Sequence, residues 1–166
     1  MVKKKEKEKK KKPTVADARQ VAALPYKRTR KGALKFLIMT SRGTRRFVIP
    51  KGWPMKRLRD HDAAAREAFE EAGVRGKIQR LPIGVYVYWK RMSRVFKLVE
   101  VDLFPLRVTR QAKEWPEKGQ RAMAWLKAQD AILLLDEPML KTLVKEFVEQ
   151  MEAKGAAVGK KKEPAP

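Results

Sequence analysis

Three glutamates lie within five residues of one another in the stretch AAAREAFEEAGVRG, residues 63–76: Glu67, Glu70 and Glu71. The alanines and glutamates of this stretch favour a helix, and Gly73 suits the left-handed residue that ends one. Residues three and four apart share one face of a helix, so the three carboxylates span an arc of roughly 100°. Hard divalent cations such as Mg²⁺ prefer carboxylate oxygens together with water and phosphate oxygens. The spacing therefore indicates a candidate cation site.

The same spacing also suits a solvated acidic face. Exposed like-charge pairs on a helix cost only about 0.2–0.5 kcal/mol each, so electrostatics alone does not decide between the two interpretations. The chain as a whole is strongly basic, with 41 Lys and Arg against 19 Asp and Glu and a formal net charge of +22. This surplus predicts an anionic partner such as a nucleotide, a nucleic acid or another phosphate-rich molecule.

The frame around the glutamates makes the motif specific. The segment GWPMKRLRDHDAAAREAFEEAGV, residues 52–74, resembles the Nudix box, which is a glycine, five residues, a glutamate, seven residues and then Arg-Glu-aliphatic-x-Glu-Glu-x-Gly-aliphatic. The positions in register are Gly52, Arg66, Glu67, Glu70, Glu71, Gly73 and Val74, with Ala68 at the aliphatic position. One position departs from the pattern, because Leu58 stands where the family has a glutamate that pairs with the motif arginine. How Arg66 is held is therefore an open question.

The resemblance extends over roughly residues 19–150. A strand ending in Ser41-Arg42, followed by a turn with an aromatic residue, Val, Pro and Gly, is similar to the diphosphoinositol polyphosphate phosphohydrolase branch of the Nudix family. The downstream stretch EWPEKGQRAMAWLKAQDAILLL resembles the end of the same branch. The implied fold is α/β, a Nudix-type α/β/α sandwich with a mixed β-sheet between helices.

The resemblance also implies an activity, that of a metal-dependent pyrophosphohydrolase that cleaves a phosphoanhydride with Mg²⁺ or Mn²⁺. Glu67, Glu70 and Glu71, with the backbone carbonyl of Gly52, are the implied metal ligands. Glu67 is the ligand or general base, and Arg66 orients the glutamates, so that Glu67, Glu70 and Arg66 are the implied catalytic residues. The implied substrate is a diphosphoinositol polyphosphate or a dinucleoside polyphosphate. The alternatives are an RNA 5′-end pyrophosphohydrolase and a non-catalytic module that binds RNA or another polyanion.

A phosphate-dense substrate needs cations, and arginine suits bidentate contacts to phosphate. Basic and hydroxyl side chains gather near two predicted strand ends. The candidate substrate-binding residues are Ser41, Arg42, Arg45, Arg46, Lys51, Lys90, Arg91 and Arg94. Each of the basic ones also suits an ordinary surface charge, so the prediction is that several converge near one end of the sheet.

Five further residues outside these sets are expected to be solvated or to pack within the structure. Glu100, Glu114 and Glu117 are candidates for an extra base, although a solvated position is the expected one for each. Trp53 follows the motif glycine and is expected to pack under its loop rather than stack on a base. His61 is expected to be solvated in the first helical turn, without a role.

Alternating and helical apolar patterns predict the elements that position these residues. Strands are expected over 19–26, 32–42, 45–50, 84–89, 95–104 and 122–126, with 90–94 as the loop of a hairpin. Helices are expected from a cap at Asp60 or Asp62 to Gly73, over 127–136 and over 138–153. Core positions of the last helix are Leu140, Leu143, Val144, Phe147 and Met151. This order favours a mixed sheet with helices on both faces.

Composition bounds the remaining possibilities. The chain of 166 residues has no cysteine and one histidine, which argues against disulfides, Cys-ligated zinc and a His-based triad. One domain is expected over 19–152, between a Lys-rich flexible tail at 1–18 and a flexible basic tail at 153–166. No apolar run approaches the roughly 18 residues of a membrane span, so a cytoplasmic protein without a membrane partner is expected. The expected partner is an anionic polyphosphate, with RNA as the alternative, and the oligomeric state stays open.

Overall fold

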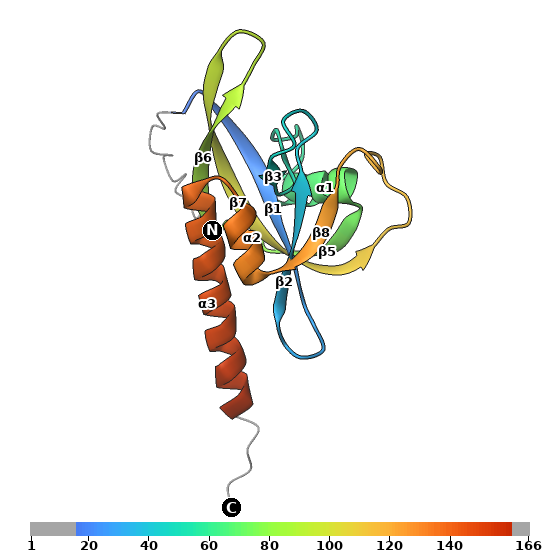
Figure 1. The fold of residues 1–166 in the computed structure, drawn as a ribbon, viewed down its shortest axis with the longest axis vertical. Helices are drawn as coiled ribbons and strands as arrows, with labels where there is room; N and C mark the ends of the chain where they lie inside the picture. The colour runs from blue at the N-terminus through green and yellow to red at the C-terminus, as the bar shows by residue number, and fades with distance from the viewer. Residues whose placement is uncertain (1–15, 161–166) are drawn as a thin grey trace, which may run out of the picture.

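A computed structural model describes residues 16–160, with side chains described as far as residue 157. One mixed sheet lies between a helix on one face and two helices on the other (Figure 1). The strands are β1 (Ala18–Arg28), β2 (Leu34–Thr40), β3 (Phe47–Val48), β4 (Lys51–Gly52), β5 (Val74–Ile78), β6 (Gly84–Arg91), β7 (Phe96–Gln111) and β8 (Met123–Lys127). The helices are α1 (Asp60–Ala72), α2 (Ala128–Leu134) and α3 (Pro138–Lys160). The predicted α/β/α sandwich is confirmed.

The centre of the sheet is a parallel pair of strands, β1 and β7, inside an otherwise antiparallel arrangement. The main strand order is β3-β2-β1-β7-β5, and β4, β6 and β8 pair with β1, β7 and β2 respectively. The short strand β4 pairs with β1 through Val21↔Gly52 and Ala22↔Lys51. This pairing places the glycine that opens the motif at the middle of the sheet.

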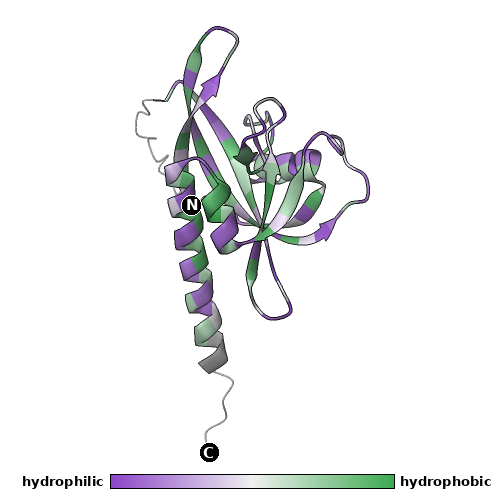
Figure 2. Cartoon of the chain, in the orientation of Figure 1, coloured by the Kyte–Doolittle hydropathy of each residue, from purple (hydrophilic) through white to green (hydrophobic). Residues whose placement is uncertain are grey.

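Alternation along β1 divides the core between the two faces of the sheet. Ala22 and Leu24 join the core under α2 and α3, whereas Val21 and Ala23 join the core under α1. All four side chains are buried, because β1 is covered on both faces, as is typical of the parallel part of a sheet. The colouring by hydropathy shows the same apolar interior (Figure 2).

The helix α1 packs through alanines, which let it approach the sheet closely. Ala63, Ala64, Ala68 and Ala72 are fully buried against the core on this face. Gly73 ends the helix with φ of 70°, as predicted, and its backbone N–H bonds the carbonyl of Phe69 at 2.8 Å. This close packing holds one face of α1, and its glutamates, against β4.

The predicted cap of α1 is wrong. Arg59 occupies the N-cap position without a side-chain cap hydrogen bond, and Asp60 and Asp62 lie inside the first turn. Asp60 pairs instead with Arg19 of β1, and Asp62 pairs with Arg59 at 2.9 Å. Both carboxylates still lie at the positive end of the helix dipole, where negative charge is favourable.

The helix α3 covers the opposite face and runs past the predicted domain boundary at 152. Its core positions Leu140, Val144 and Phe147 are buried as predicted. Residues 153–160 of the predicted tail 153–166 are helical, and the remainder of that tail lies outside the described residues. The predicted tail 1–18 likewise lies outside them, except for residues 16–18.

Several strands differ from the prediction, and β4 lies in a stretch that was predicted as a loop. The strand β1 continues through Pro25, which lies between the stretches paired to β4 and to β2 and stays in register with Leu106 of β7. The strand β5 had no predicted counterpart, since its sequence VRGKI is polar apart from its ends. It pairs with the far half of β7, which extends to Gln111 rather than ending near residue 104.

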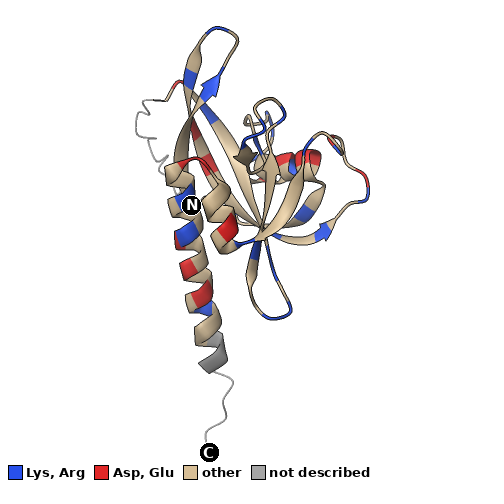
Figure 3. Ribbon diagram, in the orientation of Figure 1, with Lys and Arg blue, Asp and Glu red and all other residues tan. Residues whose placement is uncertain are grey.

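Charges are distributed unevenly, although α3 carries both signs (Figure 3). Acidic residues gather on α1, and basic residues follow the β6–β7 hairpin and several loops (Figure 3). In the part of the chain that the structure describes, no helix has the length and apolar character that crossing a bilayer requires.

Candidate active site

Gly52 and Glu67 are in direct contact, which joins β4 to α1. A Cβ atom added to Gly52 would lie 2.1 Å from Oε1 of Glu67, so only glycine leaves room for this carboxylate. The pKa of Glu67 is raised by burial first and then by the neighbouring carboxylates of Glu70 and Glu117. The glycine of the motif therefore sets where the first glutamate lies.

Glu71 is the most buried of the three glutamates, with its residue surface 8% exposed. Its Oε1 accepts a hydrogen bond from Arg121 at 3.1 Å, and its Oε2 accepts one from the backbone N–H of Lys51 at 3.3 Å. Burial raises the pKa of Glu71 to about 7, and Arg121 and Lys51 partly offset this rise. Burial also lowers the pKa of Lys51.

Arg121 was not predicted from the sequence, and it organises this cluster. Its side chain is only 8% exposed and bonds Glu71, Glu117 at 3.1 Å and the carbonyl of Thr40 at 3.2 Å. It comes from the loop between β7 and β8, which contacts the end of α1 where the N–H of Glu117 bonds the carbonyl of Glu70 at 3.0 Å. The sequence gives no signal for Arg121, because the loop pairs with α1 only through the tertiary fold.

The loop also brings Glu117 to the glutamates. Its side chain is 21% exposed and bonds Arg121, so the expectation of a solvated position is wrong for this residue. Glu114, by contrast, is 84% exposed and pairs with Lys118. Glu117 is thus the fourth carboxylate near the motif.

Glu70 is more exposed than Glu71, with its side chain 33% exposed against 11%. Arg66 donates to its Oε1 at 2.8 Å, and the two side chains are 59% and 33% exposed. Leu58, which replaces the motif glutamate, is 38% exposed. With no glutamate at position 58, Arg66 therefore pairs with Glu70, one turn along its own helix.

The donors of this cluster fit a hard divalent cation in kind, since they are carboxylate oxygens and a backbone carbonyl. The carboxylates of Glu70 and Glu117 help to raise the pKa of Glu67, and a bound cation would relieve this repulsion. Within residues 16–160, however, no three Asp, Glu, His or Cys side chains are already grouped as a metal site. Glu70 and Glu71 would have to turn from Arg66 and Arg121 to share an ion with Glu67.

A basic pocket of about 270 Å³ lies beside the buried glutamates. The lining residues are Ser41, Gly43, Thr44, Arg46, Val48, Lys51, Tyr88, Trp89, Lys90, Arg91 and Glu137. Five of the eight predicted substrate-binding residues belong to it, namely Ser41, Arg46, Lys51, Lys90 and Arg91. The predicted convergence of cations is present for the four basic residues among these five.

Contacts inside the pocket fix some of these side chains. Arg46 bonds Asp136 at 3.1 Å and Glu137 at 2.6 Å, and Glu137 is buried. The Ser41 hydroxyl accepts from the backbone N–H of Arg46 at 2.9 Å and lies 2.8 Å from the Thr44 hydroxyl. Ser41 therefore closes the turn between β2 and β3. Within the described residues, the pocket cations that form no ion pair are Lys51, Lys90 and Arg91.

The other three predicted residues lie outside the pocket. Arg42 is 59% exposed and bonds Gln120 at 3.2 Å, with Glu117 at 3.5 Å. Arg45 is exposed and has a φ of 53°, and Arg94 is exposed at the turn of the β6–β7 hairpin. These positions were grouped with the rest because loop sequence alone does not say which way each side chain turns.

Two further predictions are wrong. Trp53 is 46% exposed, with the Lys90 ammonium 5.9 Å from its ring centroid, so it does not pack under its loop. His61 is buried at 8% exposure, with its ring centroid 6.3 Å from that of Phe104. His61 thus belongs to the packing of α1 against β7.

Known proteins resemble this chain in sequence. No protein-family model matches the chain. The mouse diphosphoinositol polyphosphate phosphohydrolase 3-alpha is 32% identical over 123 residues, which cover 72% of this chain and 70% of that protein. Nudix hydrolase 12, mitochondrial, of Arabidopsis thaliana is 32% identical over 123 residues, which cover 72% of this chain and 61% of that protein. The chain belongs to the Nudix hydrolase family.

Structural likeness agrees with this assignment at the level of the fold. A crystal structure of a C. elegans Ap4A hydrolase binary complex has a TM-score of 0.61 and 20% identity, covering 81% of this chain and 98% of that one. The alignments span 61–65% of the length of three Arabidopsis relatives. Because relatives carry mitochondrial or chloroplastic names, the cytoplasmic location stays a prediction.

Proposed function

We propose that this protein is a divalent-metal-dependent pyrophosphohydrolase that cleaves a phosphoanhydride in a phosphate-rich substrate. The observation that carries the proposal is the junction of β4 with α1. There the carboxylates of Glu67 and Glu71 meet Gly52 and Lys51, and Lys51 also lines the basic pocket. A cation-binding cluster and a phosphate-binding pocket therefore share one residue and one strand.

The carbonyl of Gly52 and the carboxylates of Glu67, Glu70 and Glu71 are the proposed ligands of Mg²⁺ or Mn²⁺. When bound, such an ion neutralises charge on phosphate oxygens and lowers the pKa of water. Glu67, held by its contact with Gly52, is the ligand or the proton acceptor for the attacking water. Arg66 positions Glu70, and Arg121 positions Glu71 and Glu117. Phosphoryl transfer depends mainly on positioning and charge neutralisation, which this arrangement supplies.

The pocket favours a substrate with several phosphates. Lys51, Lys90 and Arg91 bring three cations to its lining without an ion pair to a described residue. The name of the mouse relative favours a diphosphoinositol polyphosphate. A dinucleoside polyphosphate is the other proposed substrate, because Trp89 lines the pocket and is 61% exposed, so that it offers a ring for a base.

A phosphate-release screen tests the proposal. Wild-type protein is incubated with Mg²⁺, with Mn²⁺ or with EDTA, and with a diphosphoinositol polyphosphate, a dinucleoside polyphosphate, ADP-ribose and 5′-triphosphorylated RNA. We expect metal-dependent release from one of the first two substrates and none in EDTA. The variant Glu70→Gln is expected to lose turnover and keep its unfolding midpoint. Turnover of Glu70→Gln at the wild-type rate would show that the site is assigned wrongly.

A specific observation favours a second function, the binding of RNA or another polyanion without catalysis. The β6–β7 hairpin exposes Trp89 and Phe96 at 61% and 65%, between basic residues and without an acidic one from 88 to 97. Aromatic rings among cations are typical of surfaces that bind single-stranded nucleic acid. Salt-dependent binding of many RNA sequences, together with no phosphate release from any substrate of the screen, would select this second function.

A further inference from the structure

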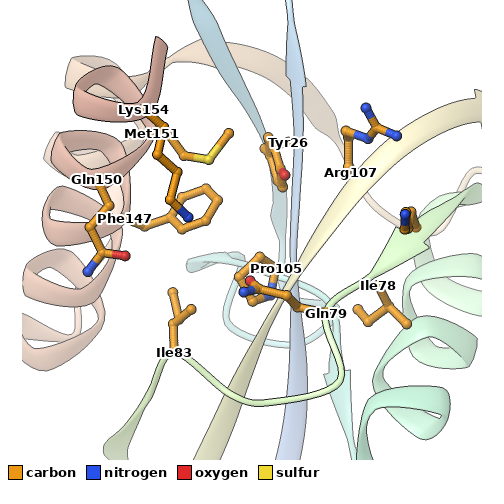
Figure 4. Close-up of a pocket in the computed structure, with 11 residues that line it drawn as sticks. Tyr26, Ile78, Gln79, Ile83, Pro105, Arg107, Phe147, Gln150, Met151 and Lys154 are labelled. Atoms are coloured by element: carbon orange, nitrogen blue, oxygen red, sulfur yellow. The ribbon is translucent and has the colours of Figure 1, made fainter. Parts of the chain in front are cut away.

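A second pocket lies at the opposite end of α3 from the candidate active site (Figure 4). It has a volume of about 220 Å³ and opens between α3, the ends of β1 and β5, and the interior of β7. The lining residues are Tyr26, Lys77, Ile78, Gln79, Ile83, Pro105, Arg107, Phe147, Gln150, Met151 and Lys154. Arg28 stabilises this end of α3 by donating to the carbonyl of Met151 at 2.8 Å.

The pocket has six polar side chains. Within the described part of the chain, none of them has a side-chain hydrogen bond or ion pair. They are Tyr26, Lys77, Gln79, Arg107, Gln150 and Lys154. Three of them are cations, and no carboxylate lines the pocket. Their excess of donors over acceptors suits an anion that is rich in acceptor oxygens.

The strands place two of the cations directly opposite each other. Lys77 of β5 and Arg107 of β7 are cross-strand partners, and Tyr26 of β1 is the partner of Arg107 on the other side. Like charges that face each other across a sheet are destabilising. Lys154 approaches from α3, on the other side of the opening in Figure 4. An anion between the helix and the strands would relieve the repulsion and contact all three cations.

The floor of the pocket is apolar and partly aromatic. The rings of Tyr26 and Phe147 meet edge to face, with centroids 5.0 Å apart. Burial raises the pKa of the Tyr26 hydroxyl, so at neutral pH this group is a neutral donor rather than a charge. Apolar walls with a few convergent polar groups are the usual form of a small-molecule site.

We propose that this pocket binds a nucleotide, with the ring system against Tyr26 and Phe147 and the phosphate between Arg107 and Lys154. The site is separate from the catalytic one. Glu137, at the start of α3, borders the basic pocket, and Gln150 borders the second pocket, so roughly 20 Å of helix separates them at about 1.5 Å per residue. Nucleotide bound here does not contact the glutamates of α1.

Isothermal titration calorimetry of the full chain tests the proposal with adenosine 5′-monophosphate in EDTA, and with adenosine and inorganic phosphate as separate probes. We expect the nucleotide to bind more tightly than either probe. The double variant Arg107→Gln/Lys154→Gln removes two charge-assisted contacts and is expected to weaken nucleotide binding about tenfold or more. Both side chains are exposed, so the double variant is expected to fold and to release phosphate from the substrate found in the screen at the wild-type rate.

Lys145→Gln is the matched control, because Lys145 is an exposed cation of α3 outside the pocket. It is expected to bind the nucleotide as the wild type does. An independent readout is stability, since Arg107→Gln removes the repulsion with Lys77 and should raise the unfolding midpoint at low salt. The proposal is overturned by any of three results: no nucleotide binding, equal binding by the double variant, or an equal loss in Lys145→Gln.

Discussion

Gly52 approaches the Glu67 carboxylate so closely that a single methyl group displaces it. In Gly52→Ala, the new Cβ would lie 2.1 Å from Oε1 of Glu67, and the carboxylate must swing away. Because the atom displaced is the end of a flexible side chain, we expect a small change in unfolding midpoint and a large loss of turnover. Gly155→Ala, in an exposed part of α3, is the control, with turnover unchanged. Normal turnover in Gly52→Ala would contradict the proposed role of Glu67.

Arg121 is a buried cation that pairs with the carboxylates of Glu71 and Glu117. Arg121→Met leaves Glu71, with its side chain 11% exposed, without its guanidinium partner. Breaking a buried ion pair in this way costs about 3–5 kcal/mol, so we expect urea denaturation to show a loss of this size. Arg66→Met is the matched control, because its pair with Glu70 is exposed and should contribute less than about 1 kcal/mol. Equal losses in the two variants would contradict the structural role of Arg121.

The junction of α1 with β5 depends on Gly73. This residue has φ of 70°, and a Cβ there would lie 2.4 Å from the ring of Trp115. Gly73→Ala is therefore expected to lose roughly 1–2 kcal/mol of stability through left-handed backbone strain. It should lose a further amount because the new Cβ displaces the tryptophan ring. Gly119→Ala separates the two costs, because Gly119 has φ of 81° and open space around it. Chemical denaturation should show a larger loss for Gly73→Ala, and equal losses would contradict this packing.

Elements with strong periodicity were predictable from the sequence. The stripe of α3 and the alanines of α1 identify their buried faces, and Gly73 identifies the end of α1. The strand β5 was not predictable, because VRGKI has no apolar alternation and becomes a strand only by pairing with β7. The cap of α1 was mispredicted because Arg19, distant in sequence, competes for Asp60.

The same distinction applies to the candidate site, where the residues of the local motif were predictable and those brought in by the tertiary fold were not. The motif identifies the glutamates and Gly52, since their spacing along one helix is local. It does not identify Arg121 or Glu117, because their loop reaches α1 only after β7 and β8 have formed. Nor does it distinguish Lys51, which lines the pocket, from Arg45, which does not.

Burial of all three tyrosines of the chain gives the whole molecule a testable dependence on alkaline pH. Burial raises the pKa of Tyr26 and of Tyr86, and it raises the pKa of Tyr88 to about 12. The unfolded value is about 10, so the folded state holds these protons more tightly. The resulting stability is fully present below pH of about 10 and is lost as pH rises from there towards 12.

Ultraviolet absorbance of tyrosinate measures this directly. We expect the native protein to ionise its tyrosines well above the pH at which the protein in urea does, and the unfolding midpoint to fall over the same interval. Tyr88→Phe is expected to remove one part of the late absorbance change and to leave the buried Gln20 without its 2.6 Å donor. A native titration that coincides with the one in urea would contradict the described burial.

The proposed activity depends most on a divalent cation gathered by the carboxylates of α1. Titration of Mn²⁺ monitored by electron paramagnetic resonance, with and without the substrate found in the screen, measures this without requiring turnover. Wild-type protein is expected to remove the signal of free Mn²⁺, and Glu67→Gln/Glu71→Gln to need about tenfold more protein to do so. Glu146→Gln/Glu149→Gln, on exposed positions of α3, should bind as the wild type does. Equal Mn²⁺ binding by the wild type and Glu67→Gln/Glu71→Gln, or no binding by the wild type even with substrate, would contradict the claim.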